Sequence, residues 1–120
     1  MKYQLTPNMR HKLNNFRSGE IKNLTTEEKT QEKPLFLIMQ EVWFDKIESG
    51  EKTEEYRDNT PFYQSRLLNK DKTAFKKYKT VILQVGYHTG AKRLIVEVEK
   101  ITLKRDFTIH LGRIIERINF

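Results

Sequence analysis

The apolar positions of this chain begin as one continuous run and then fall into short alternating segments. The run LFLIM, from Leu35 to Met39, follows Pro34 directly, and its length and bulk are typical of a strand that is buried on both faces. Later segments have apolar residues at every second position, as in strands with one buried face. These positions are Val81, Leu83 and Val85; Leu94, Val96 and Val98; and Phe107, Ile109 and Leu111. The final segment, RIIERINF, fits a strand or a helical turn, and we assign it to a strand.

Two short segments have helical features instead. In residues 41–49, Trp43 and Ile47 lie one helical turn apart, and Gly50 takes the position that follows a helix C-terminus. Residues 61–69 begin with a proline, which favours the first turn of a helix. Several short strands with two helices near the front predict an α+β fold. A small closed or nearly closed β-barrel with short helices packed on it is favoured, because closure removes exposed strand edges.

The N-terminal part of the chain differs from the rest in composition. Residues 1–33 are polar and contain few groups that a core could bury. Apolar residues recur there at helical spacing, at Met9, Leu13 and Phe16, which indicates a short helix. We therefore divide the chain into an N-terminal extension over 1–33, made of a short helix and a flexible tether, and a folded domain over 34–120.

Charge and composition narrow the function further. The net charge is +7, which favours an anionic partner such as nucleic acid, and the chain contains no cysteine. Disulfides, thiolate metal sites and thiol nucleophiles are therefore excluded. No apolar run approaches the roughly 18 residues of a membrane-spanning helix, and none resembles a signal peptide. No two histidines have metal-ligand spacing. We expect a cytoplasmic protein that binds no membrane, no metal and no cofactor.

The segment KTEEYRD, after the first helix, carries the most concentrated chemistry. On a strand, alternate side chains share a face, so Thr53, Glu55 and Arg57 would face a cleft and Tyr56 would lie on the core side. Lys52, at the preceding turn, would reach over the same cleft. Two cations suit phosphate or carbonyl oxygens, and a carboxylate between them can accept hydrogen bonds from a base edge. The alternative interpretation is an ordinary surface ion pair.

Two further groups are candidates for ligand contacts. Tyr87 and His88 directly follow the end of a strand at Gly86, where they could stack on a base or donate hydrogen bonds. The alternative is that Tyr87 covers one end of the barrel and His88 is solvated. A basic stretch between the second helix and the next strand could contact RNA phosphates, or could be a solvated loop. Its lysines are Lys70, Lys72, Lys76, Lys77 and Lys79.

The order of these segments resembles the ASCH domain, the family named for activating signal cointegrator homology. The resemblance covers about residues 34–118 and is carried by LFLIMQEVWFDKIESGEKTEEYRD, YKTVILQVGYH, LIVEVEKITL and FTIHLG, most specifically by SGEKTEEYR. It implies a PUA-like β-barrel with an RNA-related or nucleotide-related cleft between barrel and helices. Some relatives are amidohydrolases that act on acetylated cytidine through a Lys, a Thr and a distant Glu, and others are reported as ribonucleases. Lys52 matches that Lys, whereas Glu55 stands in the place of the Thr, and no late helical segment supplies the distant Glu.

The leading hypothesis is an RNA-binding or nucleotide-binding module. In it, Lys52 and Arg57 contact phosphate or carbonyl oxygens and Glu55 contacts a base edge, with Thr53 and the Tyr87 loop nearby. A hydrolase acting on RNA or on an acetylated nucleoside is one alternative, with Lys52 and Glu55 as its catalytic residues. A protein-interaction module that binds through the N-terminal extension is the other.

Overall fold

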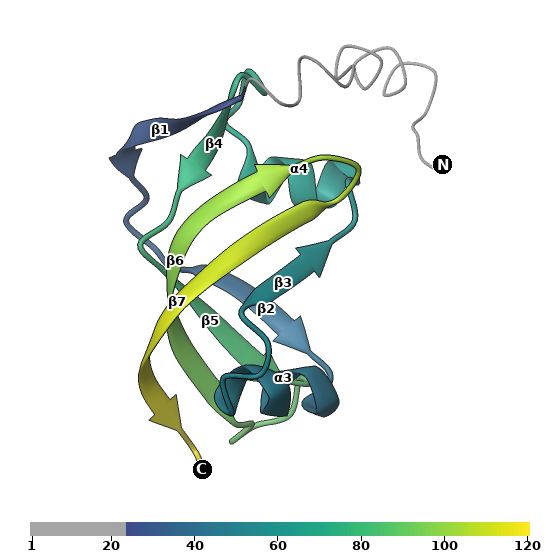
Figure 1. Cartoon of the computed structure of the whole chain (residues 1–120), viewed down its shortest axis with the longest axis vertical. Coiled ribbons are helices and arrows are strands. Elements are labelled where there is room, and N and C mark those ends of the chain that lie inside the picture. Colours follow the sequence, from purple (N-terminus) through teal and green to yellow (C-terminus); the bar gives the residue numbers. More distant parts are fainter. Residues whose placement is uncertain (1–23) are drawn as a thin grey trace.

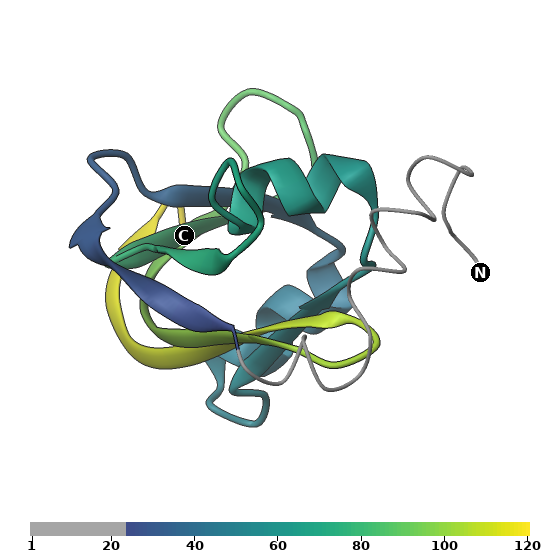
Figure 2. The same ribbon diagram turned by 90° about the horizontal axis from the view of Figure 1, so that it is seen from above.

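The computed structural model of the chain describes residues 24–120, and its main feature is one curled sheet of five strands (Figure 1). The strands lie in the order β2-β5-β6-β7-β3. Their bounds are Leu35–Met39 for β2, Thr80–Val85 for β5, Arg93–Leu103 for β6, Phe107–Ile118 for β7 and Glu54–Arg57 for β3. The β2–β5 pair is parallel and the other pairs are antiparallel. Viewed from above, the sheet bends into a half-barrel, with β2 and β3 as its two edges (Figure 2). The α+β prediction is confirmed in this form.

The two predicted helices are present at the expected places. α3 (Glu41–Glu48) follows β2, and α4 (Pro61–Leu67) follows β3. α3 ends where Gly50 takes φ +84°, a left-handed conformation that glycine adopts without a steric penalty. At the start of α4, the Thr60 hydroxyl accepts a hydrogen bond from the backbone N–H of Tyr63 at 3.3 Å. Neither helix within residues 24–120 is long and apolar enough to cross a membrane.

A second, two-stranded sheet lies beside the half-barrel and was not predicted. It pairs β1 (Thr25–Thr30) in parallel with β4 (Ala74–Lys77). β1 lies within the range that the sequence assigns to a tether, and its side chains are almost all exposed. No apolar alternation therefore indicates this strand in the sequence. The predicted helix with Met9, Leu13 and Phe16 lies outside the described residues.

The core fills the inner side of the curled sheet. Most of the alternating positions that the sequence assigns to a buried face are buried in β5, β6 and β7, and only Val85 and Val98 are half-buried. Fully buried ones include Val81, Leu83, Leu94, Val96, Phe107 and Ile109. α3 contributes Phe44 and Ile47 to this core. One expectation is corrected. β2 is not buried on both faces, because Phe36 is 38% exposed. Trp43, one helical turn from the buried Ile47, is 46% exposed.

Candidate functional site

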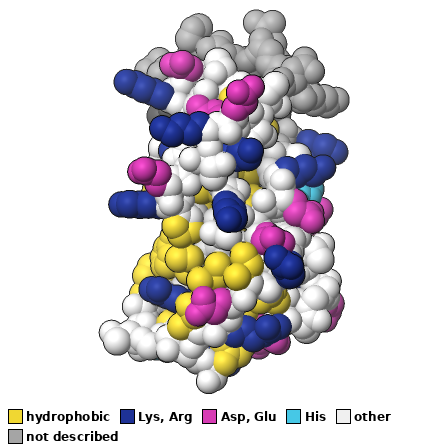
Figure 3. Space-filling view, turned by 90° about the vertical axis from the view of Figure 1, so that its left-hand side faces the viewer, with side chains coloured by type: hydrophobic (Ala, Val, Ile, Leu, Met, Phe, Trp, Pro, Cys, Tyr) yellow, Lys and Arg dark blue, Asp and Glu magenta, His cyan; other side chains and the backbone are white. Residues whose placement is uncertain are grey.

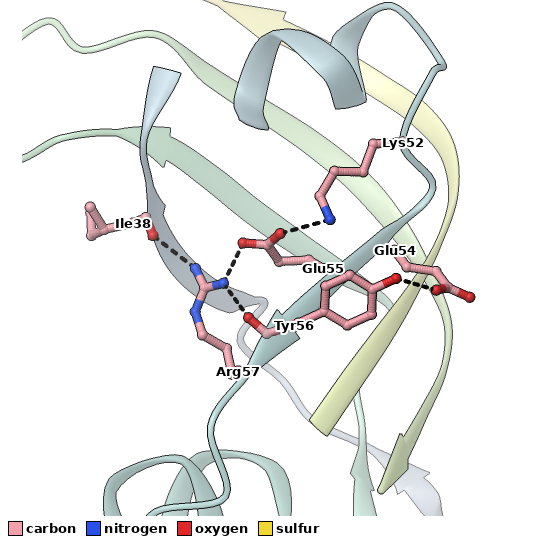
Figure 4. Close-up of polar contacts among 6 residues, drawn as sticks. All are labelled: Ile38, Lys52, Glu54, Glu55, Tyr56 and Arg57. Carbon is pink, nitrogen blue, oxygen red and sulfur yellow. Dashed lines mark hydrogen bonds and ion pairs between the residues drawn. The ribbon is translucent and has the colours of Figure 1, made fainter. Parts of the chain in front are cut away.

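Glu55 is a buried carboxylate held between two cations. The side chain of Glu55 is 9% exposed, and those of Arg57 and Lys52 are 13% and 16% exposed. Nη1 of Arg57 is hydrogen-bonded to Oε2 of Glu55, and Nζ of Lys52 lies 3.5 Å from Oε1 (Figure 4). The three side chains therefore converge, as the sequence predicts. They are mostly enclosed by the protein, which an ordinary surface ion pair would not be.

Arg57 also joins the two edges of the half-barrel. Its Nη2 donates to the backbone carbonyl of Ile38 on β2 at 2.8 Å, and its Nε donates to the Tyr63 hydroxyl on α4 at 3.1 Å. Nη1 donates in addition to the carbonyl of Tyr56 at 2.9 Å. A side chain from β3 thus spans the seam to β2, where the sheet itself has no backbone pairing. These contacts make Arg57 a structural brace of the site, and the contact with a ligand oxygen that the sequence suggests for it stays a prediction.

The ammonium group of Lys52 lies over two exposed aromatic rings. Its Nζ is 4.4 Å from the centroid of the Tyr56 ring and 5.8 Å from that of the Trp43 ring. Tyr56 is 54% exposed, so the prediction that it lies on the core side is wrong. The inner position belongs to Glu55, because Lys52 and Arg57 compensate its charge there. Sequence reasoning missed both aromatic residues as parts of the site, since it assigned Tyr56 to the core and used Trp43 only as a sign of a helix.

A chain of polar contacts fixes the Tyr56 ring. Its hydroxyl donates to Oε1 of Glu54 at 2.7 Å, and Oε2 of Glu54 lies 3.3 Å from Nδ1 of His110. Nε2 of His110 lies 2.9 Å from the Thr102 hydroxyl. The hydrogen bond to Glu54 raises the pKa of Tyr56 above its ordinary value, and burial and nearby carboxylate charge act in the same direction. The phenol is therefore protonated at neutral pH, and the hydrogen bond from its hydroxyl to Glu54 fixes the position of the ring.

A groove of about 330 Å³ lies beside this group, between the end of α3 and β7. Thr53 and the charged residues Lys52, Arg113 and Arg117 line it. The motif residue Lys52 thus belongs both to the buried cluster and to the groove. The two arginines were not singled out from the sequence, because they lie far after Lys52 along the chain and only the fold places them beside it.

The loop with Tyr87 and His88 stands apart from this group. Tyr87 is 86% exposed, and His88 is exposed as well. Gly86 has φ +68°, and its N–H donates to the carbonyl of Met39 at 3.3 Å, which sets the start of the loop. Within residues 24–120, no hydrogen bond, ion pair or ring contact joins Tyr87 or His88 to the Lys52 cluster. Their role in binding stays a prediction.

Acidic side chains lie among the lysines of the basic stretch from 70 to 79. Part of it lines a second groove of about 380 Å³, whose charged residues are Lys76, Lys77, Lys100, Glu27, Glu28 and Glu99. Nζ of Lys76 donates to the carbonyl of Ser65 at 2.9 Å. Seen from the side of β1 and β4, basic and acidic side chains are interspersed in the upper half of the molecule (Figure 3). The three lysines and three glutamates of this groove are equal in number. Contact of the basic stretch with RNA phosphates stays a prediction.

Neither metal ligands nor similarity to known proteins indicates what this site does. Within residues 24–120 there is no group of three or more His, Asp or Glu side chains that could hold a metal ion. Comparison with protein-family models, curated proteins and solved structures finds no match. The geometry of the site is therefore the basis for a functional proposal.

Proposed function

We propose that this chain is an RNA-binding or nucleotide-binding module with an ASCH-like, PUA-like fold. The observation that carries the proposal is the placement of Lys52 beside the exposed rings of Trp43 and Tyr56. Aromatic rings stack on base faces, and a lysine beside them can bind phosphate or carbonyl oxygens. The ion pair with the buried Glu55 fixes the position of this lysine. Together these groups suit a ligand with a flat base and a polar or anionic part.

The position of the motif SGEKTEEYR supports the ASCH-like part of the proposal. The segment runs from the end of α3 through Gly50 into β3. Its Lys, Glu and Arg are the three residues that converge, at Lys52, Glu55 and Arg57. Lys52 lies on the turn before β3, and Glu55 and Arg57 occupy alternate positions of that strand. The spacing of the motif therefore brings the three side chains to the same place.

Binding is better supported than hydrolysis. A general base needs an oxygen or nitrogen that can reach the proton it removes. Oε1 of Glu55 faces Lys52 and Oε2 is hydrogen-bonded to Arg57, so both oxygens are engaged within the protein. Glu55 therefore acts as a positioning residue for Lys52, and the proposed function requires no turnover.

Replacement of Tyr56 with alanine tests the stacking surface. We expect a loss of affinity of about 5- to 150-fold for a fluorescently labelled single-stranded RNA, because stacking of one base contributes about 1–3 kcal/mol. Fluorescence anisotropy at one fixed salt concentration measures the change. Phe62→Ala is the matched control, since Phe62 is 55% exposed and packs on Tyr63 and Arg66 in α4. Equal affinities for the two variants would contradict the proposal.

A further inference from the structure

We infer that the groove beside Lys52 is a phosphate site, so that the ligand is a phosphorylated nucleotide unit and not a free nucleoside. The inference rests on the proposed function for the base, which would stack beside Tyr56. The phosphate site itself is supported by the charge, the available donors and the size of the groove. Lys52 belongs to both sites, whereas Arg113 and Arg117 have no part in the proposed stacking.

The charge of the groove distinguishes it from the second groove. Lys52, Arg113 and Arg117 line it, and no Asp or Glu occurs among the described residues that do so. The second groove, on the side of β1 and β4, has a similar volume but three acids for its three lysines. A recess lined by charges of one sign concentrates the field on a small anion. The acids that pair with its cations, Glu55, Glu97 and Glu48, are not among its lining residues, so the first groove presents cations alone to a ligand.

The two arginines have donors to spare. Arg113 is 78% exposed, and its guanidinium contact to Glu97 is through Nη2 alone, at 3.4 Å. Arg117 is 47% exposed and contacts Glu48 through Nε at 3.0 Å. A guanidinium has five N–H donors, and pairs of them match two phosphate oxygens. The remaining donors of Arg113 and Arg117 are therefore available to a phosphate in the groove, unlike those of the braced Arg57.

The size and the floor of the groove suit a single nucleotide. Its volume of about 330 Å³ is near the lower end of small-molecule sites, which range from about 300 to 1,000 Å³. At Gly50, which is one of its lining residues, an added side chain would meet no atom within 4 Å. Lys52 borders both the groove and the aromatic rings. A nucleotide can thus place its base beside Tyr56 and its phosphate between Lys52 and the arginines.

The test compares ligands that differ in the phosphate alone. Isothermal titration calorimetry on the full chain would use adenosine, AMP, inorganic phosphate and a short single-stranded RNA. We expect AMP or the RNA to bind at least about tenfold more tightly than adenosine, as the gain of charged hydrogen bonds implies. A preference for AMP identifies a mononucleotide as the source of the phosphate, and a preference for the RNA alone identifies the backbone of a strand. Inorganic phosphate should compete with whichever of the two is preferred.

The double variant Arg113→Gln and Arg117→Gln tests whether the preference for a phosphorylated ligand over adenosine comes from the groove. We expect it to abolish the preference and to leave adenosine affinity within about twofold, because exposed ion pairs contribute little to the fold. Lys104→Gln with Arg105→Gln is the charge-matched control, since both residues are exposed in the turn between β6 and β7. This control should retain the preference. An equal loss in both double variants would show a general charge effect and overturn the inference.

The outcomes separate the phosphate site from the proposed function. Equal binding of adenosine, AMP and RNA by the natural chain would overturn the phosphate site and leave the base-stacking module standing. Binding of inorganic phosphate that depends on Arg113 and Arg117, with no gain from an attached base, would support the phosphate site and remove the proposed function. Absence of phosphate binding in every arm would overturn the inference.

Discussion

Replacing Arg57 with alanine is expected to lower the free energy of unfolding by about 3 kcal/mol, the usual loss when one partner of a buried ion pair is removed. The change leaves Oε2 of Glu55 without its partner, and it removes the hydrogen bonds to the carbonyl of Ile38 and to the Tyr63 hydroxyl. For a domain of about 100 residues, the melting temperature should fall by roughly 12–24 °C. Thermal unfolding followed by circular dichroism measures this shift.

Two other variants are the controls for this experiment. Arg105→Ala removes an equal charge from an exposed turn, and should change the free energy of unfolding by less than about 0.5 kcal/mol. Arg57→Lys keeps the charge but loses the planar fork of donors, and should fall between the natural chain and Arg57→Ala. If Arg57→Ala melts within about 3 °C of the natural chain, the seam between β2 and β3 does not depend on this side chain.

Replacing Lys52 with methionine is expected to lower affinity for single-stranded RNA by about 10- to 150-fold. The reason is that a hydrogen bond from a charged donor contributes about 1.5–3 kcal/mol, and methionine keeps most of the apolar stem while removing that donor. Glu55 retains Arg57 as its partner, so the fold should persist. The slope of log affinity against log salt should also decrease by about 0.7 for each phosphate that the variant no longer neutralises. Anisotropy titrations at several salt concentrations measure both effects.

Lys46→Met is the matched control for that experiment. Lys46 is on α3, is 39% exposed and pairs with Glu51 at 2.7 Å, so its removal changes the net charge equally without touching the buried cluster. We expect its RNA affinity to remain within about twofold of the natural chain, as for other exposed ion pairs. Similar losses for Lys46→Met and Lys52→Met would mean that total charge, and not the position of Lys52, determines binding.

The alternating strands could be predicted because burial at every second position is visible in the sequence, but their lengths could not. β6 continues to Leu103, beyond the predicted alternation that ends at Val98. Its pairing with β7 contains register shifts between Ile95 and Lys100, and such irregularities break the regular alternation of buried side chains. β1 could not be predicted at all, since TTEEKT has no apolar face and gains its strand conformation from pairing with β4.

The part of the candidate site that could be predicted consists of residues that are neighbours in the sequence. Alternation places Glu55 and Arg57 on one face and Tyr56 on the other, but it does not say which face is inside. The assignment of Tyr56 to the core followed from its apolar ring, and it failed because Lys52 and Arg57 allow the carboxylate to be buried. Arg113 and Arg117 join the groove through the packing of β7 beside α3, which no local pattern reveals.

The pairing of the strands also sets the order in which the molecule can assemble during synthesis. β1, β2 and β3 each pair with a strand from the later part of the chain, namely β4, β5 and β7. Pairing between distant segments carries a loop-closure cost, whereas β5, β6 and β7 form neighbouring antiparallel pairs. β3 gains its partner only when the residues from Phe107 onward have left the ribosome. A nascent chain that stops before Phe107 therefore contains the whole SGEKTEEYR segment but has no strand against which to form the site.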